Sequence, residues 1–165
     1  MADLTLDQQK ATALASARAR SRAPSQGGIP DAWRQRFEQS DRRLGLPPGT
    51  TARQIQAESS FNPSSVNPRT NARGLAQITP GAQRDAEKAA GRDLNPLVPN
   101  DSLDAHDFVW QRGLNAHSGN RVQAALDYGG FRGANRNSPA SRNYLSKIFG
   151  EHWIMYDHPD SAVVK

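Results

Sequence analysis

Glu58 is the residue of this 165-residue chain whose type and spacing point most directly to chemistry. It shares one helical stripe with Ala52, Ile55 and Phe61, because residues three apart along a helix lie on the same face. Burial beside such apolar side chains disfavours the ionised carboxylate and raises its pKa toward neutrality. A carboxyl group with that pKa is suited to act as a general acid near pH 7. The stripe therefore predicts an acid–base site at Glu58.

An ordinary structural role for Glu58 stays open at this point, since the side chain could instead reach solvent or pair with Arg53 or Arg73. Other kinds of site find little support. The chain has no cysteine, which excludes disulfides, thiol nucleophiles and cysteine-ligated metals. The four histidines, which show no metal-ligand spacing, are His106, His117, His152 and His158. With no glycine-rich phosphate loop after a strand and no serine-hydrolase elbow, we expect no metal and no cofactor.

Four short blocks carry a family resemblance. Residues 58–63 read ESSFNP, residues 71–80 read NARGLAQITP, residues 124–130 read AALDYGG and residues 142–145 read RNYL. Their order resembles the soluble lytic transglycosylase family, whose signatures are a Glu-Ser pair, a Gly-Leu-Met-Gln stretch, an Ala-Tyr-Asn stretch and a later tyrosine. The resemblance covers residues 31–150 and is most specific in the first two blocks. It implies an all-α, lysozyme-like domain of the kind shared by goose-type lysozymes and lytic transglycosylases.

By this resemblance, Glu58 takes the position of the family's catalytic acid. The implied reaction cleaves the β-1,4 bond between N-acetylmuramic acid and N-acetylglucosamine in peptidoglycan. Glu58 would protonate the leaving oxygen and then accept the proton of the muramoyl 6-hydroxyl, which gives a 1,6-anhydro product without water. A hydrolytic lysozyme is the alternative, and it would need a second carboxylate about 5–9.5 Å away. The next acids along the chain, Asp85 and Glu87, fall on a different helix from Glu58. The sequence leaves open that Asp127 approaches Glu58 and serves as this second carboxylate.

The resemblance implies that six further residues line the substrate site: Ser59, Gly74, Leu75, Gln77, Tyr128 and Tyr144. Ser59 would help to hold the site, Gln77 would contact the sugar, and the Gly74-Leu75 backbone would approach it closely. Each type also has an ordinary role, because serines end helices, glycines form turns, amides lie at surfaces and tyrosines pack in cores. The sequence leaves these alternatives open.

Three positions depart from the family pattern. Ala76 stands where methionine is usual, Gly129 where asparagine follows the tyrosine, and Asn67 where a serine is typical. These changes leave a second interpretation open, a non-catalytic structural protein of a virion or secretion complex that keeps the fold. Retention of the Glu-Ser pair and the glutamine argues against it, because a purely structural protein has no need of an acid on a core stripe.

Composition limits the other functions that the chain could have. Hydrophobic residues make up 36%, below the roughly 45–50% of globular chains, so part of the chain is expected outside the core. No run approaches the roughly 18 apolar residues of a membrane span. The net charge of +5 and the pI of about 10.1 come almost entirely from arginine. Because the arginines are scattered without interleaved aromatic residues, we do not expect a dedicated nucleic-acid site.

Helical patterns occupy the chain after residue 30, with little strand alternation and no repeats, which predicts five or six helices. The predicted starts are Asp31, a capping box of Thr51 with Gln54, Thr79-Pro80, Asn100 or Asp101, Asn120 and Ser138-Pro139. The predicted ends are Gly45, Pro63, Gly91, Gly129-Gly130 and Gly150. These elements must place Glu58 against the later tyrosines if the site is to form.

Three regions follow from the composition: an N-terminal arm and linker (1–30), a catalytic domain (31–150) and a C-terminal tail (151–165). The first residues lack the apolar run of an export signal. Since peptidoglycan lies outside the cytoplasm, we expect a phage particle to carry the chain, as a tail or internal protein, into the host cell wall during genome delivery. The arm and tail would then dock on other virion proteins, although the tail could equally form a last strand or turn on the core.

Overall fold

The computed structural model of the protein describes residues 29–157, and this part of the chain is mainly helical. Its elements are α2 (Asp31–Leu44), α3 (Thr50–Ser59), α4 (Pro80–Ala90), α5 (Pro99–Ala116), α6 (Arg121–Tyr128), the 3-10 helix η1 (Gly133–Asn137), α7 (Pro139–Phe149) and the 3-10 helix η2 (Trp153–Tyr156). Within these residues, β pairing consists of two isolated bridges in the loop between α3 and α4. The predicted all-α fold is confirmed. No helix of this part of the chain is long and apolar enough to cross a bilayer.

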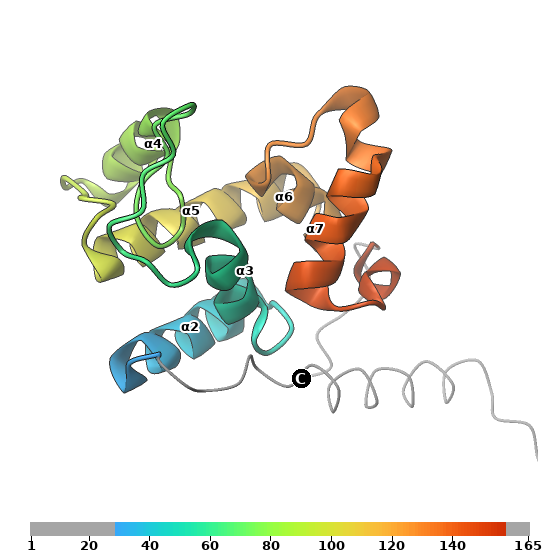
Figure 1. Ribbon diagram of the computed structural model, residues 1–165, viewed down its shortest axis with the longest axis horizontal. Coiled ribbons are helices and arrows are strands. Elements are labelled where there is room, and N and C mark those ends of the chain that lie inside the picture. Colours follow the sequence, from blue (N-terminus) through green and yellow to red (C-terminus); the bar gives the residue numbers. More distant parts are fainter. Residues whose placement is uncertain (1–28, 158–165) are drawn as a thin grey trace, which may run out of the picture.

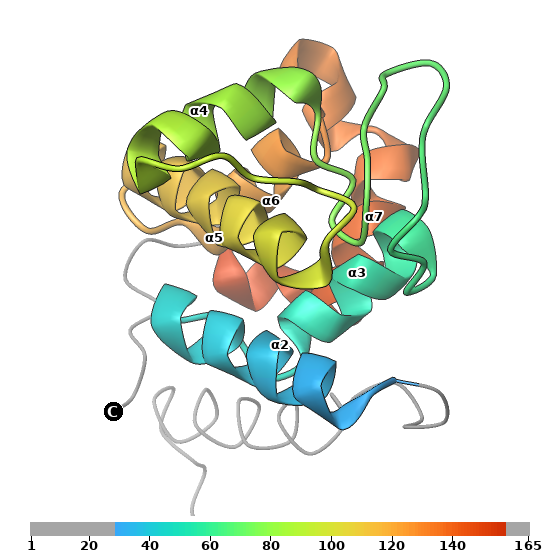
Figure 2. The ribbon, with the colours of Figure 1, turned by 90° about the vertical axis from the view of Figure 1, so that its left-hand side faces the viewer.

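The longest helix, α5, forms the centre of the molecule and packs against α2, α4 and α6. Figure 2 shows α4 and α2 on opposite sides of it. The shorter helix α3 packs on α2 and α7. In Figure 1, α3 stands between α4 with the α3–α4 loop on one side and α7 on the other. The C-terminal end of α3, which carries Glu58, therefore lies where two parts of the fold meet.

Two hydrophobic clusters make up the core. The first joins α2, α3, α4 and the first half of α5: Phe37, Ala52, Ile55, Leu75, Ala76, Ile78, Ala86, Leu94, Leu103 and Ala105. The second joins the second half of α5 with α6 and α7: Leu44, Leu46, Trp110, Leu114, Val122, Ala124, Ala125, Leu126, Leu145, Ile148 and Phe149. Ala52 and Ile55, which were predicted to share the stripe with Glu58, both lie in the first cluster. The stripe therefore faces the core, as its apolar character predicted.

Most helix boundaries follow the local signals in the sequence. The side chains of Thr79, Asn120 and Ser138 each accept a hydrogen bond from the backbone N–H three residues later. Gly45 and Gly91 end α2 and α4 in the left-handed conformation, with φ of 62° and 65°. Three other boundaries shift by a few residues: α2 begins at Asp31 itself, α5 begins at Pro99, and α3 ends at Ser59 instead of continuing toward Pro63.

The start of α3 differs from the prediction, because its cap comes from another helix. Gly49 is the N-cap residue and the predicted capping box of Thr51 with Gln54 is not formed. Instead, the carboxylate of Asp41 in α2 accepts hydrogen bonds from Gly49 N at 2.7 Å and Thr51 N at 2.8 Å. Gln54 is left to face the interior, where it is 0% exposed. A local sequence pattern cannot record a partner that a neighbouring helix supplies.

The last described residues fold against the core. The helix η2 packs on α6 and α7. Asp157 Oδ1 accepts hydrogen bonds from Asn120 Nδ2 and Gln123 Nε2, each at 3.2 Å. Residues 151–157 thus form a turn on the core, which was one of the two interpretations of the tail. Residues 1–28 of the predicted arm and residues 158–165 of the predicted tail, including His158, lie outside the described residues.

Gly74 allows the α3–α4 loop to pack on the segment before α5, and this contact can be tested by mutation. Its φ is +75°, and a Cβ there would lie 1.6 Å from the carbonyl oxygen of Pro96. We expect Gly74→Ala to lower the free energy of unfolding by more than about 2 kcal/mol, because a clash is added to the cost of a positive φ. Urea unfolding, followed by circular dichroism, measures the change.

The matched control is Gly130→Ala. Gly130 has the same φ of +75°, but a Cβ there meets nothing within 4 Å. It should therefore cost only about 1 kcal/mol, the conformational part alone. Equal losses in the two variants would show that the approach to Pro96 is not what requires glycine at position 74.

Candidate active site

Glu58 lies in the last turn of α3, at a point where the chain turns sharply. The next residues, Ser60 and Phe61, adopt the left-handed conformation with φ of 52° and 62°. This turn returns Phe61 to the first cluster, where its ring stacks on Phe37 with 6.2 Å between centroids. Because the helix ends immediately after Glu58, no further turn of α3 covers this carboxyl group.

The carboxyl group of Glu58 is largely withdrawn from water. Tyr144 in α7 donates its hydroxyl hydrogen to Glu58 Oε1, with 3.1 Å between the oxygens. Burial raises the pKa of Glu58 from 4.5 to about 7, while the Tyr144 hydrogen bond acts in the opposite direction. The raised pKa that the apolar stripe predicted is therefore present. Near pH 7 the group is divided between acid and carboxylate, which suits a group that gives a proton in one step and takes one in the next.

The alternative of an ion pair for Glu58 is not realised. The guanidinium of Arg53 donates to the carbonyl oxygen of Ile148 at 2.7 Å, and that of Arg73 donates to Asn71 Oδ1 at 3.1 Å. Among residues 29–157, Glu58 forms no salt bridge. In this part of the chain, therefore, no cation pairs with Glu58 to hold its pKa down.

Behind Tyr144 lies a buried amide that the sequence analysis did not assign to the site. Gln54 Nε2 donates to the Tyr144 hydroxyl oxygen at 3.0 Å, and Gln54 Oε1 accepts from Trp110 Nε1 at 2.7 Å. Gln54 and Trp110 are both 0% exposed. The signal available in the sequence was spacing, because Gln54 precedes Glu58 by four residues and so lies on the same helical face. The capping-box interpretation gave that residue another role.

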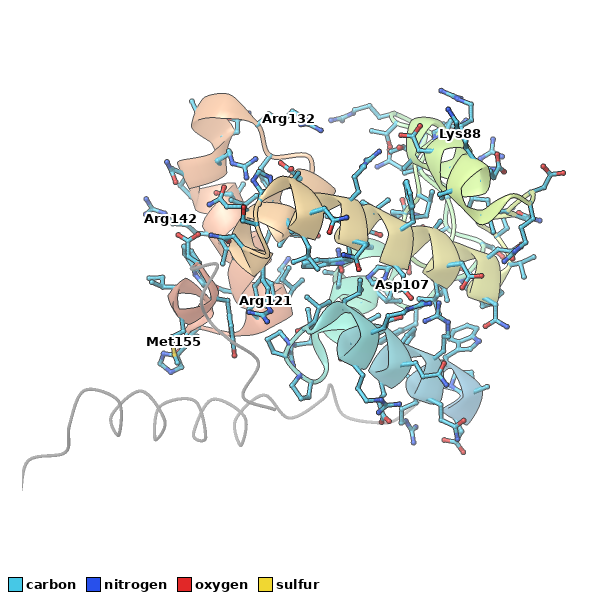
Figure 3. The ribbon with its side chains drawn as sticks, turned by 180° about the vertical axis from the view of Figure 1, so that it is seen from behind. Lys88, Asp107, Arg121, Arg132, Arg142 and Met155 are labelled. Carbon is cyan, nitrogen blue, oxygen red and sulfur yellow. The ribbon has the colours of Figure 1, made fainter. Side chains whose placement is uncertain are left out.

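His106 in α5 continues this chain of hydrogen bonds. Its Nε2 lies 3.0 Å from Gln54 Oε1, and its Nδ1 lies 2.9 Å from Asp107 Oδ1. Asp107 in turn pairs with Arg36 and Arg43 of α2, the helix that it faces in Figure 3. Burial, followed by the charges of the two arginines, lowers the pKa of His106 to about 3. Because Gln54 Oε1 and the Asp107 carboxylate can only accept, a hydrogen on Nε2 is donated to Gln54 and a hydrogen on Nδ1 is donated to Asp107.

Tyr128 joins α6 to the α3–α4 loop beside the site. Its hydroxyl donates to the carbonyl oxygen of Ala76 at 2.8 Å, and its ring packs on His106 and Trp110 with 5.5 and 6.2 Å between centroids. Burial, with the charge of Glu58, raises the pKa of Tyr128 well above its ordinary value. Tyr128 therefore keeps its proton, and its hydroxyl serves to position the loop.

The loop residues that the resemblance assigned to the substrate site differ in what they present. Leu75 is 0% exposed in the first cluster, so only its backbone is left to approach a sugar. Gly74 is required by the packing of the loop on Pro96. Gln77 is partly buried, and its Nε2 donates to the carbonyl oxygens of Gly74 at 3.1 Å and Ser65 at 3.3 Å. Of these three residues, only Gln77 has a side chain that is both polar and accessible.

Other matched positions have structural partners. Ser59 Oγ donates to the carbonyl oxygen of Ile55 at 3.2 Å, which is the ordinary role of a serine near a helix end. Asn67 Oδ1 accepts from the backbone N–H groups of the second and third residues after it and so shapes the loop. Ala76 is 0% exposed in the first cluster, so the methionine usual in the family would need space that this core does not leave.

The glycine at position 129 has a steric reason. A Cβ there would lie 2.7 Å from Phe131 Cε2 and 3.0 Å from Tyr144 Cε1. The rings of Phe131 and Tyr144 pack with 5.5 Å between centroids. Phe131, which the sequence analysis did not single out, thus occupies the space beside Gly129 and supports the ring of Tyr144. An asparagine at position 129 would require the ring of Phe131 to move.

Asp127, the candidate second carboxylate, is bound elsewhere. Its Oδ2 lies 2.7 Å from His117 Nε2, and its Oδ1 accepts from Arg136 at 2.7 Å. Burial acts to raise the pKa of Asp127, but the hydrogen bonds from Arg136 and His117 bring it below its ordinary value. One oxygen thus ties α6 to the end of α5, and the other ties α6 to η1. This arrangement gives no support to Asp127 as the group that positions a water at Glu58.

The chemistry available at this site is proton transfer by one carboxyl group. Oε1 of Glu58 is held by Tyr144, and Oε2 has no hydrogen-bond partner within residues 29–157. Within the same residues, no group of three or more His, Asp or Glu side chains is placed to hold a metal ion. A reaction in which one proton is given and later recovered fits this arrangement.

The comparisons with known proteins agree with the geometry at the level of the family. Residues 35–147 match the family model described as the transglycosylase SLT domain. This range contains Glu58, Tyr144 and every partner described behind them. No match was found among curated proteins or among solved structures.

The raised pKa of Glu58 predicts a dependence of stability on pH. An acid whose pKa is about 7 in the folded protein and near 4.5 in the unfolded chain binds an extra proton when folded between these pH values. The contribution of Glu58 to the free energy of unfolding therefore falls as pH rises through this range. Glu58→Gln should remove that fall, so the variant should match the parent near pH 4 and exceed its stability by about 2 kcal/mol near pH 8.

The control with opposite sign is Glu87→Gln. Hydrogen bonds from Gln83 and from the backbone N–H of Leu94 hold the pKa of the partly exposed Glu87 below its ordinary value. This carboxylate therefore stabilises the fold above pH 4.5, and its replacement should lower stability near pH 8. Urea unfolding at the two pH values measures both variants, and a Glu58→Gln protein that is less stable than the parent near pH 8 would contradict the burial of this carboxyl group.

Proposed function

Because the chain belongs to the transglycosylase SLT domain family, we propose that it is a lytic transglycosylase in which Glu58 is the single acid–base group. Peptidoglycan is the substrate, and glycan cleavage the activity, that this domain implies. The observation that carries the assignment to Glu58 is its environment. The carboxyl group is largely withdrawn from water with a pKa of about 7, and within residues 29–157 only its Oε1 has a hydrogen-bond partner.

The proposed reaction needs one proton at Glu58 and no external water. Protonated Glu58 gives its proton to the glycosidic oxygen as the bond from that oxygen to C1 of N-acetylmuramic acid breaks. The 6-hydroxyl of the same sugar then attacks C1 and gives its proton to the carboxylate of Glu58. The products are a chain with a free N-acetylglucosamine hydroxyl and a 1,6-anhydromuramoyl end, and Glu58 is protonated again.

The engagement of Asp127 with other partners supports this route over hydrolysis. A hydrolytic enzyme of the two-carboxylate type needs a partner about 5–9.5 Å from the acid to activate water or attack C1. Asp127 is bound to His117 and Arg136, and within residues 29–157 the hydrogen bond to Glu58 comes from Tyr144. The donor from Tyr144 stabilises the carboxylate between the two steps without supplying a base.

Gln77 is the side chain that we propose contacts the glycan. Its amide nitrogen is held by two backbone carbonyl groups of its own loop, which fixes its direction. The amide oxygen accepts no hydrogen bond within residues 29–157, so it is the atom that a sugar hydroxyl or N-acetyl N–H would meet. The backbone at Gly74 and Leu75, the aromatic pair of Tyr128 and Tyr144, and Ser59 would shape the surrounding surface.

Delivery by a phage particle is the proposal for how the enzyme reaches its substrate. It follows from the sequence resemblance and from the location of peptidoglycan outside the cytoplasm. Its function would be to open the host wall locally during genome entry. Partner contacts are proposed for residues 1–28 and 158–165, which lie outside the described residues.

Replacement of the acid tests the enzymatic proposal. Glu58→Gln keeps the size of the side chain and its acceptor for Tyr144 but removes the proton, so release of soluble fragments from purified peptidoglycan sacculi should fall by at least about 100-fold. Glu38→Gln, which changes an exposed acid of α2, is the matched control and should retain full activity. Full activity in the Glu58→Gln protein would refute the assignment.

The pH profile of the parent enzyme tests the same group. Only the protonated form of Glu58 can donate in the first step. We therefore expect kcat/KM to fall by about tenfold for each pH unit above roughly 7. Mass spectrometry of the fragments identifies the route, because anhydro ends indicate transglycosylation and reducing ends indicate hydrolysis. A preparation that yields no fragments at any pH would favour the non-catalytic structural protein.

Purified phage particles test the delivery proposal. Particles that contain the chain, detected by peptide mass spectrometry, should release anhydromuropeptides from sacculi, whereas particles carrying Glu58→Gln should not. Particles that lack the chain, or that release the fragments regardless of Glu58, would refute delivery by this route.

A further inference from the structure

We propose that Gln54 is a positioning residue that orients the Tyr144 hydroxyl hydrogen toward Glu58 Oε1 and so leaves Glu58 Oε2 to carry the acidic proton. The inference rests on the proposed function of Glu58 as the acid, and it gives Gln54 a role that neither the family match nor the sequence motifs assign to it. It depends on which atoms can donate and which can accept along one buried chain of hydrogen bonds.

The orientation of the Gln54 amide is set by Trp110. The indole Nε1–H can only donate, and it lies 2.7 Å from the side-chain oxygen of Gln54. A flipped amide would place its NH2 group against this donor and leave a buried N–H without an acceptor, which costs about 1–3 kcal/mol. The second contact of the same oxygen, with His106 Nε2 at 3.0 Å, is satisfied when Nε2 carries a hydrogen. The amide nitrogen must then point to Tyr144.

The orientation of Gln54 decides the direction of the Tyr144 hydroxyl. A phenol oxygen has one hydrogen to donate and accepts in the ring plane on the opposite side. Gln54 Nε2 occupies the accepting side at 3.0 Å. The hydrogen is therefore left to point at Glu58 Oε1, 3.1 Å away.

This direction decides which oxygen of Glu58 carries the acidic proton. Oε1 already receives a hydrogen from Tyr144, so a proton on Oε1 would face the hydroxyl hydrogen. The proton is thus directed to Oε2, the oxygen with no protein partner within residues 29–157. If the direction of these hydrogen bonds were reversed, protonated Glu58 would donate a hydrogen bond to the Tyr144 hydroxyl oxygen. Its proton would then point at Tyr144 and not at the substrate.

The inner end of the chain is anchored by charge. His106 and Asp107 lie behind Gln54, and Asp107 is held by Arg36 and Arg43. On the other side, the titratable groups that act with Glu58 are Tyr144 from α7 and Tyr128 from α6, and both have pKa values raised well above the ordinary range by burial. Neither tyrosine competes for the proton near neutral pH.

Gln54→Glu is the variant that should reverse the chain. The new carboxylate still accepts from Trp110 and His106 on one oxygen, but its second oxygen accepts where the amide donated. The Tyr144 hydroxyl should donate to this oxygen and accept a hydrogen bond from protonated Glu58 instead of donating to Glu58. We expect the pKa of Glu58, followed by carbon-13 NMR of its side-chain carboxyl group, to rise by about 1 and kcat/KM to fall by about tenfold or more.

Because the new charge alone also raises the pKa of Glu58, the measurement is made as a double-mutant cycle with Tyr144→Phe. Without the hydroxyl group, Gln54→Glu can act only through its charge. We therefore expect its effect on the pKa of Glu58 to be smaller by about 0.5 or more in the Tyr144→Phe background. Equal effects in the two backgrounds would overturn the proposal.

Gln54→Met is the neutral companion variant for the case in which Gln54→Glu does not fold. It removes the donor to Tyr144 without adding charge, so the hydroxyl oxygen is free to accept a hydrogen bond from protonated Glu58. The pKa of Glu58 should rise in this variant and should not change further when Gln54→Met is added to Tyr144→Phe. An unchanged pKa in a folded Gln54→Met protein would also refute the proposal.

The outcomes separate this inference from the proposed function. If the parent protein is inactive but the effects of Gln54→Glu and Tyr144→Phe on the pKa of Glu58 are not additive, the transglycosylase assignment is refuted and the orienting role of Gln54 stands. If the parent protein is active, its activity depends on Glu58 and the two effects on the pKa are additive, the enzymatic proposal stands and the role of Gln54 is refuted.

Discussion

The burial of one carboxyl group at the meeting point of two hydrophobic clusters is the constraint on which the rest of the site depends. The α3 helix carries Glu58 to this point and ends there, and Tyr144 from α7 holds one of its oxygens. Burial raises the pKa of Glu58 to about 7. The hydrogen bond from Tyr144 acts in the opposite direction and stabilises the carboxylate form. A fully solvated acid would be ionised at neutral pH, and one paired with a cation would be ionised as well, so neither would have a proton to give.

The fold supports this carboxyl group with other buried polar groups, each of which has a partner. Gln54, Trp110 and His106 form a connected series of hydrogen bonds that reaches Asp107 and the arginines of α2. Buried polar groups are costly when unpaired, so such a series holds its members in one arrangement. The long helix α5 supplies its inner members and is also the helix on which α2, α4 and α6 pack. Stability and site geometry thus depend on the same element.

The departures from the family pattern are explained by packing around the site. Ala76 lies within the first cluster and its carbonyl oxygen binds Tyr128, while Gly129 leaves room for the ring of Phe131 against Tyr144. Neither change removes a hydrogen bond to Glu58. The altered positions therefore reshape the surroundings of the tyrosines and leave the acid in place.

The sequence by itself determined the helical class, most helix ends and the stripe that buries Glu58, because caps, glycines and helical periodicity act within a few residues. Tertiary structure alone decided that Asp41 caps α3, that Asp127 binds His117 and Arg136, and that Gln54 lies behind Tyr144. Each of these contacts joins different elements. A hydrogen bond between helices depends on how those helices pack, and no local pattern along the chain encodes the packing of α3 against α5 and α7.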